Sequence, residues 1–300
     1  MSNERSEPTE AYEWDELTNR ILAEYPVQCV SRTGPLGQKT LHAHEGFELY
    51  LCVSGSGFYM VGDRLFPLHA GTLTVIPPHA IHRAYSGSLS SFRRFVLSVD
   101  TSYLKLLNDA CPTTEPDLLQ LLAGERSTAG SHYFLPMPQF GRVQSLLEEL
   151  EQTLLEKSFL YELTILRIMS EVVFLVVNLE EAAGNDSQPR SADELLVGDV
   201  LAYLVAHCQE EIRIEDLLWR FPVSRSRLFG LFKETTGTTI KQFLTEYRLN
   251  KAKRLLADTA LSITEVASRA GFGDLSHFYG TFRKATGVTP RSYRFQKTQQ

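Results

Sequence analysis

Residues 226–239 read SRLFGLFKETTGTT, and residues 276–289 read SHFYGTFRKATGVT. Six positions hold the same residue in the two stretches, at a constant step of 50. The recurring residues are Ser226, Gly230, Phe232, Thr236, Gly237 and Thr239, matched by Ser276, Gly280, Phe282, Thr286, Gly287 and Thr289. A repeat at fixed spacing indicates one supersecondary unit used twice. Each copy is typical of a helix, a short turn and a second helix with a basic end, which is the layout of a DNA-reading helix-turn-helix.

Helix signals extend on both sides of each stretch. We expect a helix over residues 214–221, a Pro-Val turn, and a second helix that Ser224 caps. A long helix over residues 239–258 follows, and then a helix over 262–269 with Ser262 as N-cap and Glu265 in the capping-box position. The last recognition helix is expected over residues 274–286. Apolar side chains at helical spacing should hold the second helix of each unit on the first, and they are Leu228, Leu231, Phe232, Phe278 and Phe282.

The exposed face of each second helix is expected to meet DNA. A helix placed in this way enters the major groove, and its basic residues reach phosphates. The outward residues include Arg225, Arg227 and Lys233 in the first unit, and His277, Arg283 and Lys284 in the second.

The charge of the chain is divided between its two parts. The net charge is −6, but residues 194–300 hold 16 Lys and Arg against 11 Asp and Glu, which leaves −11 for the rest. A basic module joined to an acidic one is what a DNA-binding domain fused to a sensing domain would show.

The second unit carries a dense set of fixed residue types. They are Arg248, Leu249, Ala252, Leu255, Leu256, Ser262, Ile263, Val266, Ala267, Gly271, Phe272, Asp274, Ser276, Phe278, Phe282, Gly287, Pro290, Tyr293 and Arg294. On these residues, 194–296 resembles the DNA-binding domain of the AraC/XylS family of bacterial transcription regulators. The first unit matches at Leu217, Ser224, Leu228, Phe232, Lys233 and Gly237. It departs at Leu218 and Pro222, where the family usually has Ala and Gly.

The resemblance implies which residues face the bases. They are Ser226, Phe229 and Gly230 in the first unit, and Leu275, Ser276, Tyr279 and Gly280 in the second. None is Arg, Asn or Gln, the usual bidentate base readers. Ser hydroxyls, apolar contacts with thymine methyl groups, Arg225, Arg227 and DNA shape must therefore carry more of the sequence recognition. The alternative for Phe229 and Tyr279 is hydrophobic contact with neighbouring protein.

The first part of the chain has a different pattern. Residues 1–26 form a polar arm with a short helix in it, and residues 27–100 contain short β-rich runs broken by turn residues, which predicts a sandwich or barrel. Residues 101–183 have helical spacing, with an apolar stripe that starts at Val143 and Leu146. This stripe covers the sheet or pairs between subunits, and packing is the more common role. Residues 184–193 form a linker, and Ser191 or Asp193 caps the helix that follows.

Three histidines and a glutamate form the most chemical constellation in this part. His42, His44 and Glu48 lie close together in sequence, and His82 follows Pro78. Residues i and i+2 of a strand point the same way, so these groups and Tyr50 can face one interior. The spacing, with Gly37 before it and Gly55 after it, resembles the first motif of cupin barrels. We therefore expect an α+β multidomain protein with a cupin-like barrel, covering helices and an all-α C-terminal domain.

Two kinds of ligand fit this constellation. His42, His44, Glu48 and His82 would suit a divalent metal such as Fe, Mn, Ni or Zn. Regulators of the resembled family often use such residues to hydrogen-bond an organic effector, commonly a sugar, and Tyr50 would then join them. We expect a sugar or sugar derivative first, a metal-sensing regulator second, and a metal-dependent cupin enzyme tethered to DNA third. The chain is therefore not expected to be an enzyme.

The remaining expectations concern partners and location. The resemblance implies a homodimer on paired promoter half-sites, more often an activator than a repressor, with RNA polymerase as partner if it activates. No run of about 18 apolar residues is present, so no membrane association is expected. Four cysteines without a CxxC pair suit the cytoplasm.

Overall fold

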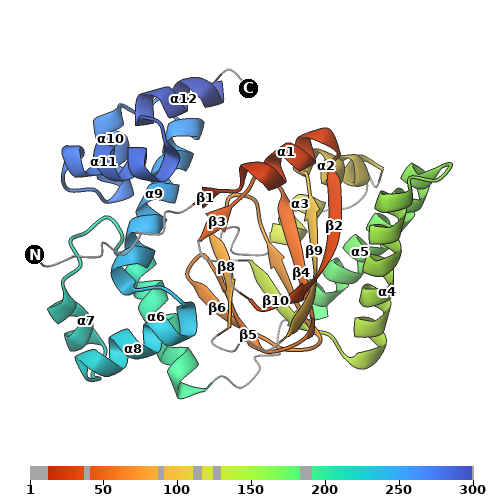
Figure 1. The fold of residues 1–300 in the computed structure, drawn as a ribbon, viewed down its shortest axis with the longest axis horizontal. Coiled ribbons are helices and arrows are strands. Elements are labelled where there is room, and N and C mark those ends of the chain that lie inside the picture. The colour runs from red at the N-terminus through yellow and green to blue at the C-terminus, as the bar shows by residue number, and fades with distance from the viewer. Residues whose placement is uncertain are drawn as a thin grey trace, which may run out of the picture.

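The computed structural model describes residues 13–36, 41–86, 91–110, 117–123, 130–182 and 191–298. Gly37 of the cupin-like motif, Cys111, residues 1–12 of the arm and most of the expected linker lie outside the described residues. Figure 1 shows a sheet-rich part with two long helices on one side and a cluster of C-terminal helices on the other. The expected α+β multidomain architecture is confirmed.

The N-terminal part contains two five-stranded sheets. One has the order β1-β3-β8-β5-β6 and the other β10-β7-β4-β9-β2, and the pairs are antiparallel except β1 with β3. The strands are β1 (Glu13–Trp14), β2 (Val27–Gly34), β3 (His42–Ala43), β4 (Phe47–Ser54), β5 (Gly57–Val61), β6 (Arg64–Leu68), β7 (Thr72–Ile76), β8 (His82–Tyr85), β9 (Phe92–Val99) and β10 (Ser131–Phe134). The cupin-like barrel thus takes the form of two facing sheets.

Strand alternation sorts the side chains of these sheets into two layers. Tyr50 and Cys52 of β4 share a buried cluster with Tyr59 of β5 and Phe66 of β6, so this cluster fills the space between the sheets. The odd-numbered residues of β4 and β9, such as Leu49 and Leu97, point to the opposite side. The period of two that predicted these strands therefore also decides which side chains line the interior.

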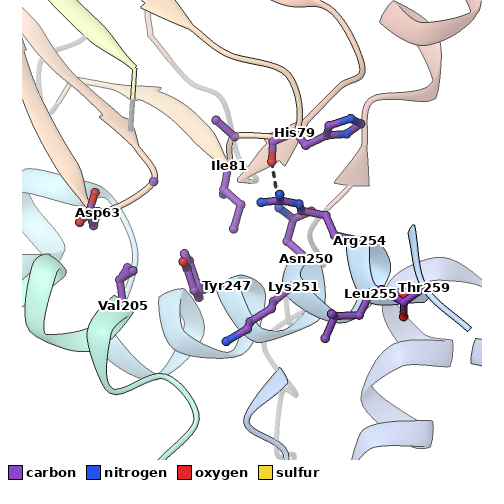
Figure 2. Close-up of a pocket in the computed structure, with 12 residues that line it drawn as sticks. Asp63, His79, Ile81, Val205, Tyr247, Asn250, Lys251, Arg254, Leu255 and Thr259 are labelled. Atoms are coloured by element: carbon purple, nitrogen blue, oxygen red, sulfur yellow. Dashed lines mark hydrogen bonds between the residues drawn. The ribbon is translucent and has the colours of Figure 1, made fainter. Parts of the chain in front are cut away.

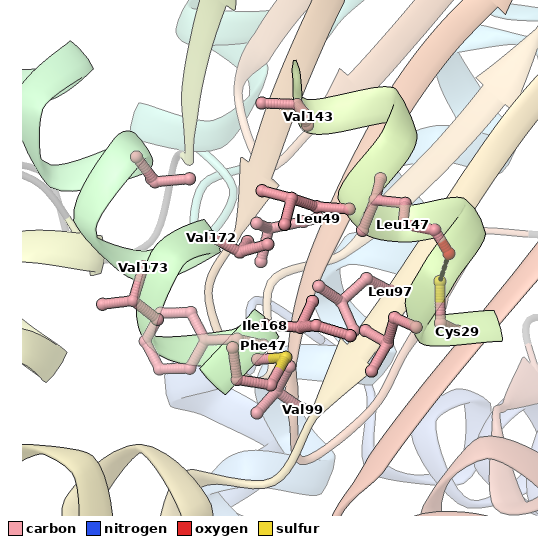
Figure 3. Packing of buried hydrophobic residues seen from close by; sticks show 14 of the residues in the cluster. Cys29, Phe47, Leu49, Leu97, Val99, Val143, Leu147, Ile168, Val172 and Val173 are labelled. Carbon is pink, nitrogen blue, oxygen red and sulfur yellow. Dashed lines mark hydrogen bonds between the residues drawn. The ribbon is translucent and has the colours of Figure 1, made fainter. Parts of the chain in front are cut away.

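Four helices come after β9, and apolar residues of all four share one buried cluster with the outer side of the second sheet, which Figure 3 shows for α4 and α5. They are α2 (Thr101–Asp109), α3 (Leu118–Ala123), α4 (Met137–Glu156) and α5 (Tyr161–Ala182). Val143, Leu146 and Leu147 of the predicted stripe are buried there, whereas Leu155 is exposed. The stripe is mainly core, as its spacing predicted. The range expected to be helical also holds β10, which pairs with β7.

The C-terminal part consists of helices only. They are α6 (Ala192–Ala206), α7 (Ile214–Arg220), α8 (Arg225–Thr236), α9 (Ile240–Asp258), α10 (Ile263–Ala270), α11 (Leu275–Thr286) and α12 (Pro290–Thr298), and α1 (Glu16–Glu24) lies in the N-terminal part. The expected caps are confirmed: Ser191, Ser224 and Ser262 each accept a backbone N–H of the first turn. None of the helices in the described residues has the length and apolarity that crossing a membrane requires.

Candidate effector site and nucleic-acid interface

A polar cluster lies between the two sheets, where most other side chains are apolar. His42 on β3 is directly opposite His82 on β8, and their rings are 4.1 Å apart between centroids. Glu48 enters from β4 in the other sheet, and the residue is 5% exposed. Two neighbouring strands, β3 and β4, and the distant strand β8 therefore place these groups together.

Glu48 is held by hydrogen bonds from both sides. Tyr59 donates its hydroxyl to Oε1 at 2.6 Å, and His44 Nε2 lies 3.0 Å from Oε2. Burial raises the pKa of the Glu48 carboxyl, but the charge of His82 and the hydrogen bond from His44 outweigh burial, so the pKa lies well below its ordinary value. Glu48 is thus an ionised carboxylate inside the protein. Sequence reasoning did not single out Tyr59, although its position on the alternating strand at residues 57–61 was a usable signal.

His44 hydrogen-bonds the Glu48 carboxylate and does not line the cavity. Its Nδ1 lies 2.9 Å from the carbonyl oxygen of Gly46, and a carbonyl can only accept. Both ring nitrogens therefore donate, which describes the imidazolium form. Burial lowers the pKa of His44, but its bond to Glu48 raises it further, so the net shift is upward. An imidazolium has no lone pair for a metal, and this separates His44 from the other three predicted ligands.

The other three residues do fit a metal ion. Ligand atoms of His42, Glu48 and His82 all lie within 4.8 Å of one another. His82 donates Nδ1–H to the carbonyl of Ala80 at 2.9 Å, which leaves Nε2 as a ligand atom 3.7 Å from Glu48 Oε2. Two imidazoles and one carboxylate suit a divalent transition metal, and a carbonyl on the second ring nitrogen is the usual support for such a ligand.

A small polar cavity opens beside this cluster, with a volume of about 50 Å³. His42, Glu48 and Tyr50 of the predicted effector set lie in its wall, whereas His44 and His82 do not. The wall also contains Arg32 of β2 and Arg94 of β9, which sequence reasoning missed. The full lining is Asp15, Thr18, Gln28, Val30, Arg32, His42, Glu48, Tyr50, Arg94, Val96 and Ser98. Even-numbered positions on β2 and β9 were the available signal, since they share the inward face.

The two predicted recognition helices, α8 and α11, have the same construction. Each begins at a capping side chain, Ser224 or Asp274, and ends at a left-handed glycine, Gly237 or Gly287. Phe232 and Phe282 are completely buried on the inner side of their helices. The outer side of each helix is therefore free to carry polar residues.

The predicted contact residues of α8 are exposed with one exception. Arg225, Ser226, Arg227, Gly230 and Lys233 are exposed. Phe229 is half-buried and packs on the core of its own unit, with the Arg225 guanidinium 5.8 Å from its ring centre. Arg227 forms an ion pair at 2.7 Å with Asp193 of α6. The alternative reading of Phe229 as a packing residue therefore has structural support.

The predicted contact residues of α11 are all exposed. Ser276, His277, Gly280 and Arg283 are on the surface, and Leu275 and Tyr279 are 39% and 37% exposed. A Cβ atom added at Gly230 or at Gly280 would meet no atom within 4 Å. Packing within the protein therefore does not require glycine at Gly230 or at Gly280.

The first helix-turn-helix unit packs against the outer face of the first sheet. Leu41, Met60 and Ile81 of the sheet-rich part share one buried cluster with Leu201 of α6 and Phe232 of α8. We call this contact the seam. Arg83 of β8 donates Nη2–H to the carbonyl of Gly237 at 3.1 Å, so polar contacts add to the apolar ones.

A second polar contact crosses the seam next to a larger cavity. Asn250 of α9 donates Nδ2–H to the carbonyl of His79 at 3.3 Å (Figure 2). The cavity has a volume of about 350 Å³, with Asp63 on the sheet side and Tyr247 and Lys251 on the helix side. No sequence signal pointed to these contacts, because they join the two parts of the chain.

Two family models match the chain. The model described as an AraC-like ligand binding domain matches residues 25–164, and a helix-turn-helix domain model matches residues 219–296. The HTH-type transcriptional activator RhaS of Citrobacter koseri is 27% identical over 271 residues, covering 84% of this chain and 86% of that protein. The uncharacterized HTH-type transcriptional regulator YdeC of Bacillus subtilis is 23% identical, covering 93% and 95%.

One solved structure is similar over most of the chain. ToxT from Vibrio cholerae O395, bound to (E)-4-(8-methylnaphthalen-1-yl)but-3-enoic acid, covers 90% of this chain and 98% of its own. Its sequence identity is 12% and its TM-score is 0.38.

Proposed function

The chain belongs to the AraC family of transcription regulators and is a ligand-responsive DNA-binding protein, and from that premise we propose that an effector bound between the sheets controls the first helix-turn-helix unit through the seam. One observation carries this proposal. Strand β8 has His82 in the polar cluster and, one residue later, Arg83 bonded to Gly237 of α8. A strand with one side in the ligand site and the other on the DNA-binding part can transmit a shift of either.

A second connection runs parallel to β8. His44 bonds Glu48 through its side chain, and its carbonyl accepts the N–H of His79 at 2.8 Å. The carbonyl of His79 in turn accepts from Asn250 of α9. These contacts form a continuous path from Glu48 to α9. Energetic coupling between the ligand site and the DNA-binding part along this path requires a measurement.

The DNA partner is double-stranded promoter DNA, with α8 and α11 in successive major grooves. Base contacts from Ser226 and Ser276, and phosphate contacts from Lys233 and Arg283, agree with the exposure of all four residues. Tyr279 has the exposure that a base contact needs. The half-buried Phe229 instead supports Arg225 from below.

The effector is a small molecule that contacts His42, Glu48 and Tyr50 in the cavity wall. The hydroxyl, carboxylate and imidazole groups of the wall match the chemistry of a sugar or sugar derivative, and the cavity of about 50 Å³ has to widen to admit one. The relative RhaS is named as a transcriptional activator, and we propose activation of transcription, with RNA polymerase as partner, for this chain also.

We further propose a cytoplasmic homodimer. Large apolar side chains are exposed where α4 and α5 meet and along α5, and Phe159 is 92% exposed. The set is Leu155, Phe159, Leu160, Leu163 and Phe174. A surface of this kind is common at contacts between subunits.

A metal-sensing regulator is the second candidate. It is favoured by the geometry of His42, Glu48 and His82, which would hold the ion, with His44 and Tyr59 orienting the carboxylate. A bound divalent ion would supply positive charge between the sheets. A cupin enzyme tethered to DNA has no observation beyond these same residues, and we propose that the chain is not an enzyme.

The deciding experiment measures metal content and DNA binding together. Full-length protein purified without a His-tag or chelator is analysed for metals, with His82→Ala as the ligand variant and His44→Gln as the matched control. A stoichiometric metal that is lost in His82→Ala and whose removal changes DNA affinity would favour the metal sensor. A sugar panel that changes promoter affinity without a metal supports the organic effector. If no metal and no metabolite changes DNA affinity, geometry or transcription, the proposed control is wrong.

A further inference from the structure

Two arginines are paired at the edge of the polar cavity in the sensing part, where Arg32 is exposed to solvent and Arg94 is half-buried. Arg32 on β2 and Arg94 on β9 are register partners in an antiparallel pair, and both line the polar cavity. Like charges at directly opposite positions of a sheet destabilise it unless something of opposite charge lies between them. The pair therefore requires an explanation.

The protein itself does not supply the opposite charge. Within the described residues, neither Arg32 nor Arg94 has an ion pair, and Arg94 Nη1 is buried without a hydrogen-bond partner. Glu48, the acid of β4, forms no ion pair with either arginine, and its two oxygens accept hydrogen bonds from Tyr59 and His44. Asp15, the other acid in the wall, accepts from Thr18 with both oxygens.

The neighbouring arginine on the same strand behaves differently. Arg93 points to the opposite face of β9 and pairs with Glu148 of α4 at 3.3 Å. The outward arginine thus has its own carboxylate, whereas no carboxylate among the described residues pairs with Arg94. This contrast indicates that the partner of Arg94 comes from outside the chain.

A neutral hydrogen-bonding group lies beside the arginines. The Tyr50 side chain is 2% exposed, and its hydroxyl is buried without a hydrogen-bond partner. Tyr50 is on the same inward face, one pair further along the sheet, opposite Val96. An unsatisfied buried hydroxyl costs free energy, so a ligand that bonds it would recover that cost.

We infer that the effector carries an oxyanion, a carboxylate or phosphate, that binds between Arg32 and Arg94, with its hydroxyl groups toward Tyr50 and Glu48. Guanidinium groups match the geometry of carboxylate and phosphate oxygens with paired N–H donors. The ligand class is therefore an acidic hydroxylated metabolite, such as a sugar acid or a sugar phosphate, rather than a neutral sugar. This inference rests on the proposed function, since it describes the ligand of the same site.

The test compares acidic and neutral probes on full-length protein. Binding of D-galacturonate, D-glucose 6-phosphate and neutral D-galactose is measured by calorimetry at constant ionic strength, with inorganic phosphate as a minimal anion. We expect at least one anion to bind, D-galactose not to bind, and Arg94→Gln to weaken binding roughly 10- to 100-fold, as loss of a charge-assisted bond predicts. Arg32→Gln should act in the same direction. Arg93→Gln, with the same charge change on the outer face, should leave affinity unchanged.

The outcomes separate this inference from the proposed function. Galacturonate binding without glucose 6-phosphate binding identifies the carboxylate, and the reverse identifies the phosphate. The inference is overturned if no anion binds, or if D-galactose binds as tightly as galacturonate and Arg94→Gln changes neither. If galactose binds and alters promoter affinity, the proposed function stands without the acidic ligand. If an anion binds through Arg94 but DNA binding stays the same, the acidic site stands and the proposed control fails.

Discussion

The two helix-turn-helix units share a local construction but not an environment. Thr236 and Thr286 donate their hydroxyls to the carbonyls of Phe232 and Phe282 at 2.7 and 2.8 Å. The capping glycines have nearly equal φ angles, 71° at Gly237 and 75° at Gly287. The core of the second unit contains residues of α9 to α12 and the loops between them. The core of the first continues into the sheet-rich part.

This difference separates recognition from regulation. A motif with the same caps and the same buried phenylalanine can bind DNA in either environment. Among the described residues, the buried core of the first unit continues into strands that also line the polar cluster, whereas α11 of the second unit contacts the sheet-rich part at β1. The first unit is therefore placed to respond first to an effector. The second unit can hold the protein on DNA while the first changes position.

The largest effect should come from removing the central phenylalanine of each unit. Phe232→Ala and Phe282→Ala should each cost about 3–5 kcal/mol, because both side chains are completely buried. Hydrogen exchange should show Phe282→Ala loosening α10–α12 alone, whereas Phe232→Ala should also expose the outer face of β5 and β6. Equal and local effects of the two substitutions would contradict the shared core.

Both acid and base should weaken the sheet-rich part, because each disrupts the pair of His44 and Glu48 between the sheets. The folded pKa of Glu48 lies below its ordinary value of 4.5, so its contribution is present above pH 4.5 and is lost as the pH falls through the folded value. The folded pKa of His44 lies above 6.5, so its contribution is complete below 6.5 and is lost as pH rises through the folded value. Between pH 4.5 and 6.5 both Glu48 and His44 therefore contribute fully to stability.

Unfolding of wild type and His44→Gln over a pH series checks this directly. Breaking a buried pair costs about 3–5 kcal/mol, so the difference between the two proteins should be largest between pH 4.5 and 6.5. The second unit has an apolar core cluster without a buried ion pair, and its exposed capping carboxylate Glu265, whose pKa the Ser262 hydrogen bonds lower, should weaken it only toward acid pH. A constant difference across the series would mean that His44 and Glu48 do not act as an ion pair.

The capping glycines offer a matched pair of substitutions. Alanine is strained at both positive φ angles, at about 1–2 kcal/mol. At Gly237 a Cβ would also lie 2.4 Å from Tyr85 and 2.6 Å from Arg83, whereas at Gly287 it would meet nothing within 4 Å. Gly237→Ala should therefore destabilise more, by about 1–3 kcal/mol beyond Gly287→Ala, in thermal unfolding. Equal losses would indicate that the seam opens freely.

Arg83→Ala should loosen the seam without unfolding either part. It removes a charge-assisted bond to Gly237 and should cost about 1.5–3 kcal/mol. Exchange of amides near the end of α8 should rise, and the effect of ligand on promoter affinity should shrink. Arg294→Ala is the control, since its Nε bonds Leu256 within the second unit. An unchanged ligand response in Arg83→Ala would remove β8 from the coupling route.

The smallest effects concern phosphate contacts, where the repeat pairs Lys233 with Arg283. Each alanine substitution should lower the slope of log affinity against log salt by about 0.9 and weaken all sequences alike. Ser276→Ala should instead change sequence preference. Fluorescence anisotropy at several salt concentrations measures both. If Arg283→Ala leaves affinity and slope unchanged, α11 does not lie in the groove as proposed.

Local patterns predicted much of this molecule. The repeat and its capping residues located α8 and α11, and strand alternation placed Glu48, Tyr50 and Cys52 on one inward face. The cysteines in the described part, Cys29, Cys52 and Cys208, are free and buried. The sequence placed His44 in the metal-ligand set with His42, Glu48 and His82. Its role as a hydrogen-bond donor to Glu48 could not be predicted, because it depends on how Gly46 and Glu48 lie in the folded chain.

The sequence by itself determined the helix-turn-helix repeat, the family and the inward face of each strand, because caps and periodicity act over a few residues. The tertiary structure decided which groups meet across long separations. Arg32 opposes Arg94 through strand register, and Arg83 reaches Gly237, 154 positions away, through packing of the two parts. Register and docking depend on the summed contacts of whole surfaces. No short pattern encodes them, and they set both the charge of the cavity and the difference between the two DNA-binding units.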